Sequence, residues 1–269
     1  MAAILDAKGL NKSFGAVTAA SDINAAIEQD SVVGLIGTNG AGKTTFINMI
    51  TGYLKPDRGR IHYEGRDITD LAPRDITRIG ICRSFQIPQL YSSLTAYENM
   101  LMGLGVVMRN AGVGGFFSRG RPNVPGHGRP AEEVADAILE RFGLVEYRDK
   151  NAQVLPGGVR KLLDIALTMA AKPRILLLDE PTSGVSAEEK FVIMEMIMKA
   201  VRAEGATVLF VEHDMEVVSR FAQRVLAFYD GRIIADGSPD AVLSDREVKR
   251  FVVGGELHRL DEKQGAANA

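Results

Sequence analysis

The 269-residue sequence has a single cysteine and no tryptophan, and its charges almost balance, with 32 basic and 34 acidic side chains. Cys82 has no partner for a disulfide within the chain, which suits a reducing compartment, and we expect it to be a small core residue. The formal net charge of −2 gives no electrostatic reason to expect a nucleic acid or an anionic membrane surface as partner.

Long hydrophobic runs are also missing. No stretch approaches the ~18 apolar residues that a membrane-spanning helix needs, because the most apolar candidate, 162–178, is interrupted by charged residues and a proline. The first ten residues include Asp6 and Lys8 and therefore do not resemble a secretion signal. If this protein works at a membrane, we expect another chain to supply the spans.

The apolar residues that are present, 46% of the chain, suffice for one sizeable core or for a core and a subdomain. Three short apolar runs at 32–36, 175–178 and 207–211 predict buried parallel strands. Helical patterns separate them, as at 188–204. Polar or glycine-rich residues follow each run, at the strand ends where open α/β sheets place ligands. The sequence therefore predicts an α/β fold.

Other segments predict structure beside this parallel core. Asp230-Gly231 and, more weakly, Glu64-Gly65 indicate hairpin turns, so some antiparallel structure is expected. The glycine-rich stretch 103–130 predicts an irregular excursion, either a tolerated surface insertion or a contact surface for a partner. A helix is predicted for 131–142, and a polar tail begins at 254.

The most informative segment is 37–44, which fits G-x-x-x-x-G-K-[ST], the phosphate-binding loop of nucleotide triphosphatases. A strand pattern precedes it and a helical pattern follows, which argues against a glycine-rich turn that binds nothing. Lys43 would reach the β- and γ-phosphates, and the Thr44 hydroxyl would hold Mg²⁺. The candidate nucleotide-binding residues of this segment are Thr38, Asn39, Gly40, Ala41, Gly42, Lys43, Thr44 and Thr45.

Two acids follow the apolar run at 175–178, and a histidine follows the run at 207–211. Asp179 would hold Mg²⁺ through water, and Glu180 would act as general base on the attacking water. His213 could donate to the γ-phosphate and sense its loss. Alternatively, Asp179 and Glu180 are solvated acids at a strand end, and His213 has a structural role. The phosphate loop in the same chain favours the functional interpretation of all three residues.

Taken in order, these segments resemble the ATP-binding subunits of ABC transporters over almost the whole chain. Residues 37–44 resemble the Walker A motif, and 175–180 resemble Walker B with its catalytic glutamate. The resemblance implies that His213 is the switch histidine. It also implies that Gln86 is the Q-loop glutamine, which contacts Mg²⁺, and that Phe14 stacks on adenine. Alone, Phe14 and Gln86 would be ordinary core and surface residues.

This resemblance implies a P-loop NTPase (RecA-like) core with a mostly parallel sheet, an antiparallel β edge subdomain and an inserted helical subdomain. The whole chain, 1–269, would be one ABC ATPase domain. Its nucleotide-binding core would comprise 1–86 and 164–253. The helical subdomain would be 87–163, including the insertion 103–130, and 254–269 would be a C-terminal tail.

Within that family the resemblance is to the ATPases of branched-chain amino-acid importers, through 37–45, 85–88, 94–99 and the insertion 103–130. It implies ATP hydrolysis that energises uptake, at the cytoplasmic face of the inner membrane. It also implies a second ATP-binding subunit in a dimer, two permease subunits and, indirectly, a periplasmic binding protein. Urea or short-amide importers and other ABC transporters, exporters included, stay open, as does a soluble ABC ATPase acting on nucleic acid or ribosomes. A metabolic P-loop kinase is less favoured, because it would need a substrate lid and would not need His213 as a switch.

The signature loop departs from the family pattern, because Leu155 is followed by Pro156, Gly157, Gly158 and Val159. A serine hydroxyl and a helix N-terminus normally close over the γ-phosphate held by a partner subunit. Pro156 has neither a hydroxyl nor an N–H, although it suits the start of a helix. Gly157 and Gly158 still offer N–H groups. We expect a weakened phosphate contact, and hence two unequal sites if the partner ATPase is a different chain.

Overall fold

The computed structural model describes residues 3–84, 89–113 and 122–254. The chain forms two compact units, a first unit from the residues before 78 and after 206, and a second unit from 78–206. Across the described ranges, no helix combines the length and the apolar character that crossing a membrane requires.

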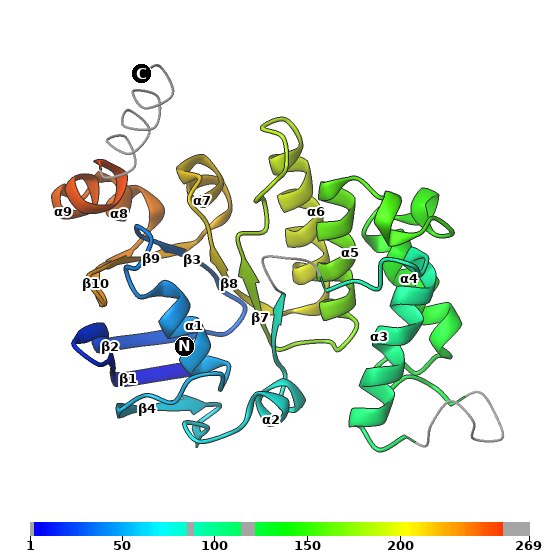
Figure 1. Ribbon diagram of the computed structural model, residues 1–269, viewed down its shortest axis with the longest axis horizontal. Helices are drawn as coiled ribbons and strands as arrows, with labels where there is room; N and C mark the ends of the chain where they lie inside the picture. Colours follow the sequence, from blue (N-terminus) through cyan, green and yellow to red (C-terminus); the bar gives the residue numbers. More distant parts are fainter. Residues whose placement is uncertain (1–2, 85–88, 114–121, 255–269) are drawn as a thin grey trace. The chain divides into compact units, whose positions relative to one another are not determined.

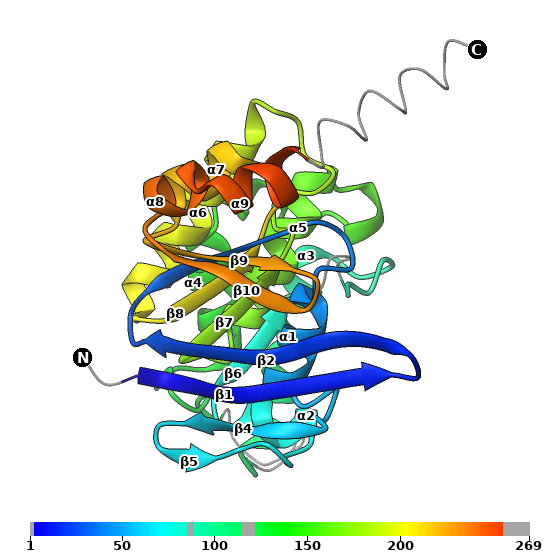
Figure 2. The same ribbon diagram turned by 90° about the vertical axis from the view of Figure 1, so that its left-hand side faces the viewer.

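The first unit contains a long antiparallel hairpin that the sequence analysis missed. Strands β1 (Ala3–Phe14) and β2 (Val17–Glu28) pair with each other, and β4 (Arg58–Tyr63) and β5 (Arg66–Asp67) extend the sheet in the order β2-β1-β4-β5 (Figure 2). Buried Ile23, Ala25 and Ile27 alternate with exposed residues, as in a strand with one covered face. The predicted hairpin at Glu64-Gly65 is confirmed as the β4–β5 turn.

The second set of strands in this unit follows the order β10-β9-β3-β8. Strand β3 (Val32–Ile36) pairs in parallel with both β8 (Thr207–Val211) and β9 (Arg224–Tyr229). Strand β10 (Arg232–Gly237) pairs antiparallel with β9 through the predicted Asp230-Gly231 turn. All residues of β3 and β8 are buried, which confirms the prediction of buried parallel strands at these positions.

Helix α1 (Lys43–Ile50) lies between these two sheets and forms the centre of the core (Figures 1 and 2). Its Phe46 ring packs against Phe228 of β9 with 5.6 Å between the ring centroids, and both side chains are fully buried. The remaining helices of this unit are short. They are α2 (Pro73–Arg78), α7 (Met215–Phe221), α8 (Pro239–Ser244), α9 (Arg246–Val248) and a π-helical turn, Lys249–Val253.

Among its described residues, the second unit combines two parallel strands with four longer helices (Figure 1). Strand β6 (Ile81–Ser84) pairs with β7 (Ile175–Asp179), which confirms the predicted strand at 175–178. The predicted helices at 131–142 and 188–204 are confirmed as α4 and α6. The helices are α3 (Ala96–Asn110), α4 (Ala131–Arg141), α5 (Gly157–Met169) and α6 (Glu189–Glu204), with short 3-10 turns at Val145–Tyr147 and Ala152–Val154.

The prediction that 103–130 is irregular is wrong for its first part, because α3 continues through Gly103 and Gly105 to Asn110. Two interior glycines cost the helix about 1 kcal/mol each relative to alanine. A Thr95–Glu98 capping box and a buried face that includes Met100, Leu104 and Met108 offset that cost. Gly103 also has a packing role, since a Cβ there would lie 2.7 Å from Leu167 Cδ2 of α5.

The two hairpin turns share a backbone conformation but differ in their surroundings. Gly65 and Gly231 have φ angles of 77° and 72°, each after a residue that is also left-handed. Gly231 donates its N–H to the Ala41 carbonyl at 3.1 Å and accepts from the N–H of Ser21 at 2.8 Å. A Cβ on Gly231 would lie 3.1 Å from the carbonyl carbon of Ala19, whereas a Cβ on Gly65 would meet no atom within 4 Å.

We therefore expect Gly231→Ala to lower the free energy of unfolding more than Gly65→Ala does. Both substitutions place alanine at a left-handed φ, at a cost of about 1–2 kcal/mol. Gly231→Ala must also displace β2, which adds roughly 1–3 kcal/mol. Urea denaturation of both variants measures the difference, and equal destabilisation would contradict close packing of the β9–β10 turn.

Candidate functional site

The predicted strand, loop and helix around 37–44 are confirmed. The loop leaves β3 and enters α1 through three glycines with positive φ angles: 148° at Gly37, 82° at Gly40 and 107° at Gly42. A Cβ on Gly37 would collide with the Phe228 carbonyl oxygen, and one on Gly42 would lie 2.9 Å from the Ala19 carbonyl oxygen. Only glycine fits these two positions, because the backbone is both left-handed and packed against neighbouring strands.

Lys43 lies inside this loop, and its side chain is buried. Its ammonium group donates to the carbonyl of Gly37 and, at 3.1 Å, to the carbonyl of Thr38. Residues Asn39, Gly40 and Thr44 are exposed at the loop surface, Thr38 and Thr45 are half-buried, and Ala41 and Gly42 are buried. The candidate residues from 38 to 45 therefore form one contiguous turn around an ammonium group.

The start of α1 can receive an anion. Gly42 precedes the helix in the left-handed conformation, and within the described residues no side chain caps the first turn. The first N–H groups of a helix have no partner inside the helix and carry its positive dipole end. Together with the Lys43 ammonium, this is the arrangement that binds phosphate groups.

Phe14 ends β1, and 53% of its surface is exposed, with the Lys12 ammonium 5.8 Å from the centroid of its ring. The two residues before it contact Asp57, whose carboxylate accepts from Lys12 Nζ at 2.6 Å and from the Ser13 N–H at 2.8 Å. The hydrogen bond from Lys12, followed by that from Ser13, lowers the pKa of the Asp57 carboxyl.

His213 follows β8, in the first unit. Its backbone N–H donates to the Glu212 carboxylate at 3.2 Å, and the next residue, Asp214, caps α7. Because β3 and β8 are parallel, with Leu35 opposite Val211, His213 and the phosphate loop both follow the carboxyl ends of neighbouring strands. The structure thus places the loop and His213 at the same edge of these strands. Gln86 lies outside the described residues.

Asp179 and Glu180 follow the buried strand β7, in the second unit. One Asp179 oxygen, Oδ2, accepts from Arg83 Nη2 at 2.5 Å, and the Asp179 carbonyl accepts from Lys161 Nζ at 3.2 Å. Glu180 has a φ angle of 47°, in the left-handed region that is uncommon for residues other than glycine.

The signature-like segment begins α5 as expected. Pro156 immediately precedes the helix, and its carbonyl accepts the Arg160 N–H at 3.0 Å, so proline does not disturb the helix. Pro156 and Gly157 are exposed. Gly158 also serves packing, because a Cβ there would lie 2.9 Å from Ile193 Cδ1 of α6.

Three residues near these candidate sites were not selected from the sequence. Gly231 was recognised only as part of a turn, although it also contacts the phosphate loop. Arg83 and Lys161 both contact Asp179. For Arg83 and Lys161, the only local signal was a basic residue within an otherwise apolar segment. Such a signal does not indicate which residue the basic side chain contacts.

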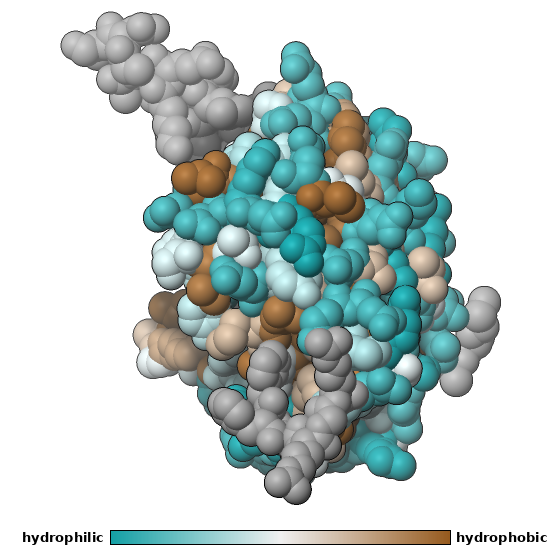
Figure 3. Space-filling view, turned by 90° about the vertical axis from the view of Figure 1, so that its right-hand side faces the viewer, coloured by the Kyte–Doolittle hydropathy of each residue, from teal (hydrophilic) through white to brown (hydrophobic). Residues whose placement is uncertain are grey.

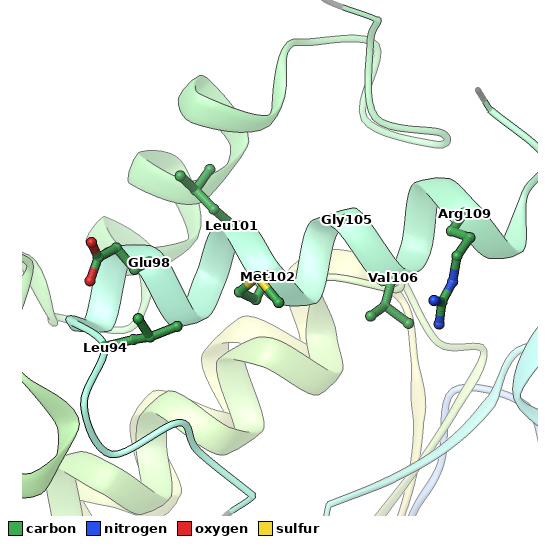
Figure 4. Close-up of a pocket in the computed structure, with 7 residues that line it drawn as sticks. All are labelled: Leu94, Glu98, Leu101, Met102, Gly105, Val106 and Arg109. Carbon is green, nitrogen blue, oxygen red and sulfur yellow. The ribbon is translucent and has the colours of Figure 1, made fainter. Parts of the chain in front are cut away.

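An apolar groove of about 410 Å³ runs along α3, well suited to apolar contacts and not to a triphosphate (Figure 4). Within it, Met102 and Val106 are 47% and 44% exposed. On the face that includes α3 and α4, hydrophobic side chains form separate patches among hydrophilic ones (Figure 3). The groove is lined by Leu94, Glu98, Leu101, Met102, Gly105, Val106 and Arg109.

Comparison with known proteins agrees with this geometry. The model of the ABC transporter family matches residues 20–183. The chain is 34% identical to the Pseudomonas aeruginosa high-affinity branched-chain amino acid transport ATP-binding protein BraF, over 93% of this chain and 98% of that protein. It is 33% identical to a probable branched-chain amino acid transport ATP-binding protein, LivG, of Archaeoglobus fulgidus, over 96% of this chain and 98% of that protein.

Solved structures show the same fold. The ADP conformation of the ATP-binding cassette MJ1267 has a TM-score of 0.78 and 30% identity, covering 93% of this chain and 98% of that one. A dimeric post-hydrolysis state of the cassette MJ0796, bound to ADP and Pi, has a TM-score of 0.71 and 26% identity, covering 87% and 98%. With a P-loop NTPase fold and this relationship over nearly its whole length, the chain belongs to the ABC transporter family, as an ATP-binding cassette.

Proposed function

We propose that this chain binds and hydrolyses ATP to energise an importer of branched-chain amino acids. The observation that carries the proposal is the glycine-shaped loop from β3 into α1, which surrounds the Lys43 ammonium, in a chain related over 93% of its length to a branched-chain amino acid transport ATP-binding protein. The loop supplies the nucleotide chemistry, and the relatives suggest the transported class.

For the nucleotide, we assign the phosphates to the backbone and side chains of residues 38–45 and the adenine to the exposed ring of Phe14. In a dimer, the start of α5 at Pro156, Gly157 and Gly158 would face the terminal phosphate of the nucleotide that the partner subunit holds.

The chain also offers hard oxygen donors of the kind that Mg²⁺ prefers. These are the exposed Thr44 hydroxyl in the first unit and the Asp179 carboxylate in the second, and Gln86 is the third proposed ligand. Among the described residues, no group of three or more His, Cys, Asp or Glu side chains could hold a metal ion by itself. Nucleotide oxygens and water would therefore complete the coordination. Bound Mg²⁺ would neutralise charge on the phosphates.

Glu180 is the proposed general base that accepts a proton from the attacking water. His213 is proposed to donate to the γ-phosphate and to respond to its loss. Two ATP-binding chains would enclose two nucleotides, so that binding closes the dimer and hydrolysis removes the contact that holds it closed.

The partners follow from this function. We propose a second ATP-binding subunit, two permease subunits and, indirectly, a periplasmic binding protein, with this chain at the cytoplasmic face of the inner membrane. Within the proposed subdomain 87–163, the apolar groove of α3 offers exposed Met102 and Val106 to a permease.

Glu180→Gln tests the catalytic assignment. The amide keeps the shape of the side chain and one acceptor oxygen but cannot accept the proton, so hydrolysis should fall by roughly 10²–10⁴ while ATP binding is retained. The dimer should stay closed in ATP, which size-exclusion chromatography detects. Exposed Glu188 supplies a matched control, because Glu188→Gln should hydrolyse ATP at the normal rate. Retained hydrolysis in Glu180→Gln would remove Glu180 from the role of base.

Pro156→Ser tests the hypothesis of two unequal sites. The substitution restores a hydroxyl and an N–H at the start of α5, and the slower composite site should then turn over faster. The ATPase rate of the assembled transporter should rise, and it should rise more if the chain forms a homodimer, in which both sites contain Pro156. An unchanged rate would count against the hypothesis.

The transported class is tested with the assembled transporter in vesicles that contain ATP. Uptake of radiolabelled leucine should require ATP, compete with isoleucine and valine and be unaffected by urea. The Glu180→Gln complex provides the inactive control. ATP-dependent uptake of urea or of a short amide, without uptake of leucine, would replace the proposed substrate while leaving the ATPase assignment intact.

A further inference from the structure

The carboxylate of Asp179 is held by an arginine on the neighbouring strand. Strands β6 and β7 run in parallel with Arg83 opposite Leu177. Because side chains alternate along a strand, Arg83, Leu177 and Asp179 share one face of this strand pair. From there, Arg83 Nη2 reaches Asp179 Oδ2 at 2.5 Å.

This ion pair is well shielded from solvent, since the side chains of Arg83 and Asp179 are 12% and 15% exposed. A second cation lies nearby, because the ammonium of buried Lys161, on α5, donates to the Asp179 carbonyl at 3.2 Å. Partly buried charge pairs are screened less by water and salt than surface pairs, so the interaction at Asp179 is stronger than an exposed salt bridge.

We propose that Arg83 is an internal counter-ion that competes with the divalent metal ion for the carboxylate of Asp179. This inference rests on the proposed function, in which Asp179 is a ligand of the nucleotide's Mg²⁺. With the metal absent, Arg83 neutralises and orients the carboxylate. When metal and nucleotide bind, the guanidinium gives up Oδ2, so Arg83 sets how much divalent ion the site requires.

Two physical consequences follow. The cost of separating Arg83 from Asp179 is subtracted from the binding free energy of the metal, so removal of the guanidinium should tighten metal binding. The competition also keeps a partly buried carboxylate paired throughout the cycle, which avoids the penalty of an uncompensated buried charge. Arg83 is thus a positioning residue that acts through Asp179.

The test uses the full chain with Glu180→Gln, so that ATP is not consumed, and Mn²⁺ as a spectroscopic substitute for Mg²⁺. Mn²⁺ is titrated into the protein–ATP complex and followed by electron paramagnetic resonance. Arg83→Met, which keeps an unbranched apolar stem but removes the charged guanidinium, should tighten Mn²⁺ binding by about tenfold, the change that corresponds to about 1.4 kcal/mol. Arg83→Lys, which keeps the charge, should lie between Arg83→Met and the native arginine.

Arg148→Met is the matched control. Arg148 also pairs with an aspartate, since its Nε donates to Asp136 at 2.8 Å, but this pair is more exposed and does not involve β6 or β7. The control removes the same charge from the second unit and should leave Mn²⁺ binding unchanged. If Arg148→Met tightens binding as much as Arg83→Met, a general charge effect replaces the proposed competition.

Unchanged or weaker Mn²⁺ binding in a folded Arg83→Met variant would overturn the inference. If Arg83→Met does not fold, arginine side-chain NMR of the Glu180→Gln chain tests whether metal binding separates Arg83 from Asp179. Addition of Mg²⁺ to the ATP complex should shift the Arg83 guanidinium signals and speed the rotation of the group, and unchanged signals would overturn the inference. Failure of the chain to bind ATP with Mg²⁺ would instead refute the proposed function.

Discussion

The backbone path from β3 into α1 is the constraint on which the rest of this structure depends. It turns through left-handed glycines that are packed against the carbonyl groups of Phe228 and Ala19, and the β9–β10 turn contacts it through Gly231. Because this packing leaves no room for a Cβ at Gly37 or Gly42, the backbone has one way to present its N–H groups. The neighbouring strands hold both this backbone and the buried Lys43 side chain in place.

A second theme is polar chemistry at the ends of buried strands. Strands β3, β7 and β8 are almost entirely apolar, so each is immobilised by the core and delivers its following residues to a defined place. After β7 the chain turns at Glu180 with a left-handed φ, and the Glu180 carbonyl accepts the Ser183 N–H at 3.1 Å. The strand and the turn together stabilise a conformation that an isolated glutamate would rarely adopt.

The sequence predicted those strands and turns that are specified by a few consecutive residues. The apolar runs at 32–36, 175–178 and 207–211 and the turn at Asp230-Gly231 are visible in a few consecutive residues. The extent of α3 was missed, because interior glycines suggest loop unless the buried face and the capping box outweigh them. The β1–β2 hairpin was missed because its covered face includes small alanines, which weaken the alternation of polar and apolar residues.

The sequence by itself determined which chemical groups are available: a phosphate loop with its lysine, two acids after an apolar run, and a proline without hydroxyl or N–H at the start of α5. These are properties of neighbouring residues, which a linear reading captures. Only the tertiary structure decided that Gly231 contacts the loop, that Gly103 lets α3 approach Leu167, and that Arg83 pairs with Asp179. Each of those contacts joins residues far apart in the chain, and a close approach in space depends on how the strands and helices pack, which residue type alone does not specify.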